Sequence, residues 1–123
     1  DEAGFVREVR EMVGEGVEYE LEGVFHPGVE FSHETLLFEA IQGSMARLDP
    51  EGVVAPYMVT GGTDARCLTG LDIQVYGFIP MRYEPGMEFF DLCHGHDERV
   101  STDNVRFAVQ ALFDVVCRLN GIV

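Results

Sequence analysis

Two apolar runs that flank a glycine turn constrain the fold of this chain more than any other feature. Residues 53–59 and 73–79 are rich in β-branched and aromatic side chains, and a Gly-Gly-Thr-Asp turn at 61–64 follows the first run. A short helical stretch beginning near Thr63 would join the two runs as a βαβ crossover with parallel pairing. Pro56 removes one ladder donor, so we expect a bulge or an edge position in the first run. The pattern predicts an α/β fold.

Three further stretches carry apolar residues at helical spacing. The first covers residues 2–13. The second is predicted to be capped by Ser32 and to end at residue 48. The third is predicted to be capped by Ser101 and to end at residue 119. The last helix is expected to bury one face, made of Val105, Ala108, Val109, Leu112, Val116 and Leu119. Residues 17–21 alternate apolar side chains with glutamate, which is typical of a strand with one buried face. His26-Pro27-Gly28 interrupts the pattern after this strand, and we place a domain boundary there.

Composition limits the classes of function. The chain has 123 residues, enough for one core, and a net charge of −14 from 22 acidic and 8 basic residues, all of them arginine. No basic patch is available to bind nucleic acid, and no apolar run approaches the roughly 20 residues of a membrane helix. Three cysteines without CxxC spacing argue against a disulfide framework and a cysteine zinc cage. We expect a cytoplasmic protein with neither nucleic-acid nor membrane partners.

The glycine turn is a candidate anion site. Gly61, Gly62 and Thr63 stand where a strand should pass into a helix, which is where open α/β sheets bind ligands and where backbone N–H groups attract carboxylates or phosphates. Paired glycines also occur in turns without a ligand, so the spacing alone leaves both interpretations open. We expect Asp64 to cap the following helix rather than to act in catalysis.

His94 is the candidate metal ligand. It should lie in a loop between the apolar Phe89-Phe90 pair and the last helix, where an imidazole can hold a metal or simply form an ordinary hydrogen bond. His96 lies two residues further on. The two rings and an acidic neighbour would make a mononuclear site if they converge.

The residues beside His94 are expected to play lesser parts. Cys93 has no neighbour except the histidine that would activate a thiolate, so we interpret it as a packing residue. Asp97 and Glu98 are expected to be solvated or paired with Arg99.

Three motifs in order resemble the zinc metallopeptidase family that includes glutamate carboxypeptidase, aminoacylase, acetylornithine deacetylase and succinyl-diaminopimelate desuccinylase. The resemblance covers nearly the whole chain and corresponds to the C-terminal third of that family. Its most specific parts are Gly-Gly-Thr-Asp-Ala-Arg at 61–66, Tyr-Gly-Phe at 76–78 with Pro80, and His94-Gly95 followed by Asp-Glu-Arg-Val at 97–100.

The resemblance implies a fold and a domain division. Residues 25–123 would form the C-terminal part of an α/β, three-layer catalytic domain of the phosphorylase/hydrolase-like zinc-peptidase type. Residues 1–24 would be the last helix and strand of an α+β lid domain, through which the parent protein would form a homodimer. The N-terminal part of the catalytic domain, with the general base, would lie outside this chain.

The resemblance also implies a function. The parent would hydrolyse the amide bond of an N-acyl amino acid or small peptide with water activated by two zinc ions. His94 matches the last zinc ligand, while Gly61, Gly62 and Thr63 match a segment that receives a substrate carboxylate. A catalytic zinc needs about three protein ligands, and this chain would supply one, so alone it is expected to contain no catalytic residue and to be inactive. The alternative is a stand-alone, non-catalytic module that binds an anion at the glycine turn or assembles through the 17–21 strand.

Overall fold

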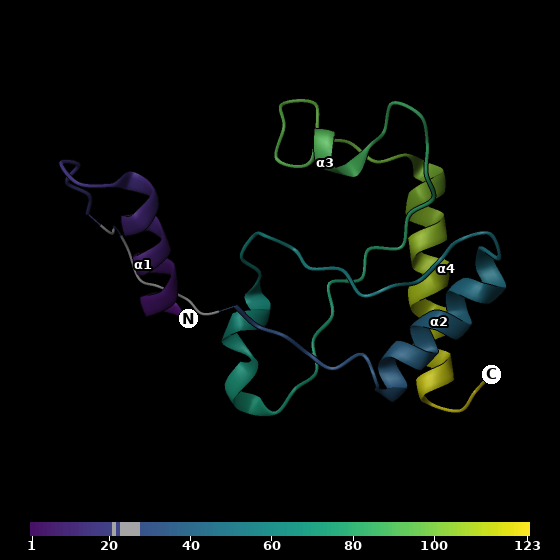
Figure 1. Cartoon of the computed structure of the whole chain (residues 1–123). Coiled ribbons are helices and arrows are strands. Elements are labelled where there is room, and N and C mark those ends of the chain that lie inside the picture. The colour runs from purple at the N-terminus through teal and green to yellow at the C-terminus, as the bar shows by residue number, and fades with distance from the viewer. Residues whose placement is uncertain (21, 23–27) are drawn as a thin grey trace. The chain divides into compact units, whose positions relative to one another are not determined.

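The computed structural model describes residues 1–20, 22 and 28–123, and the regular elements of these residues are helical (Figure 1). Within this part of the chain no β-strand occurs. The elements are α1 (Glu2–Val13), α2 (Leu36–Leu48), the 3-10 turns η1 (Asp64–Cys67) and η2 (Thr69–Leu71), the short α3 (Phe89–Leu92) and α4 (Thr102–Leu119).

The chain divides into two compact units. Unit 1 comprises Asp1–Phe31 and Thr60–Val75, and unit 2 comprises Ser32–Val59 and Tyr76–Val123. Unit 1 holds α1, whose predicted bounds are confirmed, together with the glycine turn. Unit 2 holds α2, α3 and α4 with the His94 loop. The predicted domain boundary after residue 24, with His26 and Pro27, lies outside the described residues.

The core of unit 2 forms where α2 and α4 pack against each other (Figure 1). Each helix contributes apolar side chains at helical spacing, so one face of each is removed from water. Ala111 is fully buried, which lets the two backbones approach closely at that level. The buried cluster consists of Ala40, Ile41 and Met45 from α2 with Phe107, Ala111 and Val115 from α4.

Two details of these helices correct the sequence predictions. Thr35, not Ser32, caps α2: its hydroxyl accepts a hydrogen bond from the Phe38 N–H at 3.2 Å and is itself 2.6 Å from the Tyr76 hydroxyl. The predicted buried face of α4 is also wrong. Five of its six members are exposed: Val105, Val109, Leu112, Val116 and Leu119. The prediction fails because α4 carries apolar residues on most sides and its buried side includes polar residues that find partners. The Ser101 cap of α4 is confirmed.

The predicted strands are not seen in the structure. Residues 53–59 and 73–79 have no regular secondary structure, and Val53 is 91% exposed. Residues 17–20 likewise form no strand, and Leu21 lies outside the described residues. A strand exists only through a neighbour that accepts its backbone hydrogen bonds, and the described residues offer these segments none. The α/β architecture therefore stays a prediction for a longer protein.

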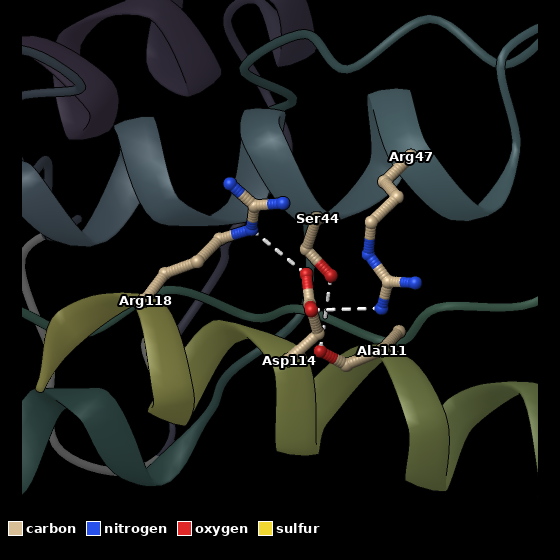
Figure 2. A network of polar contacts seen from close by, with 5 residues as sticks. All are labelled: Ser44, Arg47, Ala111, Asp114 and Arg118. Carbon is tan, nitrogen blue, oxygen red and sulfur yellow. Dashed lines mark hydrogen bonds and ion pairs between the residues drawn. The ribbon is translucent and has the colours of Figure 1, made fainter. Parts of the chain in front are cut away.

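A buried carboxylate links α2 and α4. The Asp114 side chain is 7% exposed and accepts one hydrogen bond from Arg47 at 2.7 Å and one from Arg118 at 2.8 Å (Figure 2). Beside it, the fully buried Ser44 hydroxyl donates to the Ala111 carbonyl oxygen at 3.2 Å. The hydrogen bond from Arg118 and then that from Arg47 hold the pKa of Asp114 below its ordinary value, against the opposing effect of burial.

This lowered pKa predicts acid sensitivity. Because the folded carboxyl has a lower pKa than the unfolded one, its stabilising effect is complete above the unfolded pKa of about 3.9 and is lost as the pH falls through the folded pKa. Asp114→Asn should lower the melting temperature at pH 7 and make no further difference at about pH 2. Thermal unfolding followed by circular dichroism from pH 7 to 2 measures this.

Asp103→Asn is the matched control for that experiment. It removes from the same helix an acid whose side chain is 82% exposed and forms an ion pair with Arg106 at 2.8 Å. Exposed pairs of this kind contribute little to stability. Equal losses of melting temperature in the two variants at pH 7 would contradict the role given to Asp114.

Candidate functional site

His94 lies in a tight turn directly after α3. The Gly95 N–H donates to the Leu92 carbonyl oxygen at 2.9 Å, which makes His94 the third residue of a four-residue turn. Its φ is 60°, in the left-handed region that L residues adopt rarely and histidine more often than most. The residue is exposed, so the imidazole is accessible to a ligand. The predicted loop position of His94 is confirmed; its unusual backbone could not be predicted.

The backbone around this turn is close-packed. A Cβ at Gly95 would lie 3.1 Å from the Leu92 carbonyl oxygen, so the glycine allows the chain to fold back on α3. A second, weaker turn follows, in which the Glu98 N–H donates to the Gly95 carbonyl oxygen at 3.4 Å. The two turns fix the direction in which the chain leaves His94.

Glu88 secures the other end of α3. Its backbone carbonyl accepts from the N–H groups of Asp91 and Leu92, both at 3.2 Å. Its carboxylate accepts from the Gly86 N–H at 3.2 Å and from the Tyr83 hydroxyl at 3.4 Å. The backbone N–H groups of Glu88 and Gly86, in that order, lower the pKa of this carboxyl. The helix that precedes His94 is thus attached at both ends.

An exposed imidazole such as that of His94 can supply one ligand to a metal, but a metal site needs several. Among the residues that the structure describes, no group of three or more histidine, cysteine, aspartate or glutamate side chains is arranged to hold a metal. The mononuclear site built from His94, His96 and an acidic neighbour is therefore not found there. Further ligands would have to come from another part of the protein.

The neighbours of His94 differ from expectation in one respect. Arg99 does not pair with the carboxylate of Asp97 in the contacts the structure shows; its guanidinium donates to the Asp97 backbone oxygen at 2.9 Å. Asp97 and Glu98 are exposed, as expected for solvated groups, and Cys93 is half-buried.

The glycine turn belongs to unit 1, whereas His94 belongs to unit 2. Gly61, Gly62 and Thr63 are exposed, and Thr63 is the extended residue that precedes η1, with no side-chain capping bond. A Cβ at Gly62 would lie 3.6 Å from an Arg66 guanidinium nitrogen, so an arginine head lies beside the turn. The sequence argument did not single out Arg66 for anion binding, although it stands in the same Gly-Gly-Thr-Asp-Ala-Arg segment.

Comparison with known proteins gives one weak similarity. The chain is 29% identical over 86 residues to the N-fatty-acyl-amino acid synthase/hydrolase PM20D1.1 of Danio rerio, a match that covers 70% of this chain and 16% of that protein. No family model and no solved structure matches the chain. The similarity loosely supports the resemblance to the zinc metallopeptidases. Among the described residues, no helix is both long and apolar enough to cross a bilayer.

The backbone of His94 predicts an order of stability among substitutions. A left-handed backbone costs an L residue about 1–2 kcal/mol. Glycine avoids this steric cost but loses about 0.5–1 kcal/mol through the greater entropy of its unfolded backbone. His94→Gly should therefore equal or exceed the wild type in stability, His94→Asn should match it, and His94→Val should lose about 1 kcal/mol or more because it is β-branched. Urea unfolding midpoints give the order. A valine variant as stable as the glycine variant would mean that His94 does not hold this backbone conformation.

Proposed function

We propose that this chain is part of a zinc-dependent amidohydrolase that cleaves the amide bond of an N-acyl amino acid or a small peptide. The observation that carries the proposal is the similarity to an N-fatty-acyl-amino acid synthase/hydrolase. In the reaction, water adds across the amide: the acyl carbon gains oxygen to become a carboxylate, and the nitrogen leaves as an amine. The chain spans a small part of that relative's length, so the activity belongs to the longer protein.

His94 would hold one of two zinc ions. Its exposed imidazole, set on a turn between α3 and α4, supports this role. When bound, zinc polarises a carbonyl group and lowers the pKa of water toward 7. The contribution of this chain would be to present an imidazole nitrogen from a fixed turn. The other ligands and the general base are proposed to lie outside these residues.

Gly61, Gly62 and Thr63 would receive the carboxylate of the substrate. Their exposure leaves the turn accessible, and the Arg66 head beside Gly62 adds positive charge. Arginine suits this task because its planar fork matches a carboxylate. Residues 25–123 would form the C-terminal part of an α/β catalytic domain in the whole protein, and residues 1–24 would belong to a lid that mediates dimerisation.

A second candidate is a non-catalytic anion-binding module centred on the same turn. The position of Arg66 beside Gly62 favours it, since backbone N–H groups and a guanidinium together attract carboxylates. The two candidates differ in zinc dependence. An anion-binding module would retain its ligand after the metal is removed by a chelator, whereas the amidohydrolase would lose its activity.

The direct test uses the full-length protein that contains this chain. Zinc content is measured by elemental analysis, and hydrolysis is measured on N-acyl amino acids with short and long acyl groups. His94→Asn keeps the turn but removes the imidazole ring, so it should lower hydrolysis on the order of 100-fold or more, with loss of bound zinc. His96→Asn is the matched control and should leave both nearly unchanged. Full zinc content and activity in His94→Asn would refute the proposal.

A further inference from the structure

The loop that carries His94 is closed at its base by three nested polar contacts. They join Arg82 to Asn104, Glu84 to Ser101, and Gly86 to Arg99. From one contact to the next, the residue number rises on one side, from 82 to 84 to 86, and falls on the other, from 104 to 101 to 99. Segments 82–86 and 99–104 therefore run side by side in opposite directions, as in a hairpin, without being strands. We name these three contacts the loop clamp.

Asn104 makes the contact at the base of the loop, where the loop joins the core of unit 2. It is 5% exposed, and its side-chain oxygen accepts from the Arg82 backbone N–H at 2.7 Å while its side-chain NH₂ donates to the Arg82 carbonyl at 3.0 Å. One amide thus satisfies both backbone groups of one residue, as a neighbouring strand would. The Arg82 guanidinium lies 4.5 Å from the Phe107 ring centre and donates to the Leu48 carbonyl oxygen. The start of the loop is thereby attached to both α2 and α4.

Ser101 makes the second contact, and it uses its hydroxyl group, which also caps α4. Its hydroxyl accepts from the Asn104 N–H at 3.0 Å and donates its hydrogen to the Glu84 carboxylate at 2.7 Å. Next to Glu84 the chain turns, with the Met87 N–H donating to the Glu84 carbonyl at 3.0 Å and Gly86 at a φ of 77°. Pro85 and Gly86 are the residue types that such a turn requires at its centre.

Arg99 makes the third contact and closes the loop. Its two terminal nitrogens donate to two backbone carbonyls, that of Asp97 at 2.9 Å and that of Gly86 at 3.4 Å. The closed segment 86–99 contains α3 and both turns around His94. The Gly86 N–H in turn donates to the carboxylate that precedes α3, that of Glu88. Compact loops of this kind, with their ends held together, behave as units of defined shape.

We propose that the loop clamp positions the His94 imidazole, and that Arg99 is a positioning residue for it. The inference rests on the proposed function, in which His94 holds a zinc ion. A metal ligand must be held within about 0.5 Å of its working position, and an unclamped loop would not hold it there. Arg99 contacts no reacting group. It acts through the backbone on both sides of the His94 turn.

The test compares three substitutions in the full-length protein. Arg99→Ala removes the bridge, Arg99→Lys keeps the charge but cannot span both carbonyls with a planar fork, and Arg106→Ala is the control, an exposed arginine of α4 whose ion pair is with Asp103. Two properties are measured: the zinc dissociation constant, by chelator competition, and the hydrogen exchange of the Gly95 amide, which bonds to the Leu92 carbonyl oxygen.

Both Arg99 variants should weaken zinc binding about 10-fold or more, the size of effect seen for groups that orient ligands, and should speed exchange at Gly95. Arg106→Ala should change neither, and the melting temperatures of the Arg99 and Arg106 variants should agree. If the Arg99 and Arg106 variants behave alike in both measurements, the inference is overturned. A lysine variant that behaves as the wild type would overturn the bridging geometry, since charge alone would then suffice.

Adding His94→Asn to these substitutions separates this inference from the proposed function. Full zinc content in His94→Asn refutes the function itself, whatever Arg99 does. Loss of zinc in His94→Asn, together with unchanged zinc affinity and unchanged Gly95 exchange in Arg99→Ala, refutes the clamp alone.

Discussion

The packing of α2 against α4 is the interaction on which the rest of unit 2 depends. Phe107, Ala111 and Val115 bury one side of α4 against α2, and this burial is the main source of stability available to the unit. Ser101, which caps this helix, and Asn104 in its first turn are residues that attach the His94 loop. The core and the candidate site therefore share one rigid element. Loss of the core would therefore release the loop, although among the described contacts none joins a core residue to His94.

Arginine carries much of the polar cross-linking in a strongly acidic chain. Only eight basic residues oppose 22 acidic ones, yet four arginines bind groups at defined places in unit 2. Arg47 and Arg118 bond the buried carboxylate of Asp114, whereas Arg82 and Arg99 donate to backbone carbonyls. Several donors in a planar fork let one side chain join two segments at once. Lysine, which the chain lacks, could not replace these bridges.

The positions of α1, α2 and α4 could be predicted from the sequence, whereas the short α3 and the contacts between residues far apart in the chain could not. Helix spacing and the Ser101 cap are local signals, and they give the bounds of α4 correctly, although the spacing did not identify its buried face. Thr35, not Ser32, caps α2, and its hydroxyl also contacts Tyr76, which lies far along the chain. The predicted strands at 53–59 and 73–79 have no ladder partner among the described residues, and pairing of that kind is not local.

The sequence by itself determined the bounds of α1, the end of α2 and both ends of α4. It also determined that a glycine turn precedes Asp64 and that His94 lies in a loop before the last helix. Capping and helical spacing act over three or four residues, so the sequence carries them directly. Only the tertiary structure decided which face of α4 is buried, that Arg99 binds carbonyls rather than acids, and that three contacts close the His94 loop. Those contacts join residues 13 to 22 positions apart, and such pairs are set by how the chain folds back on its core rather than by any local pattern.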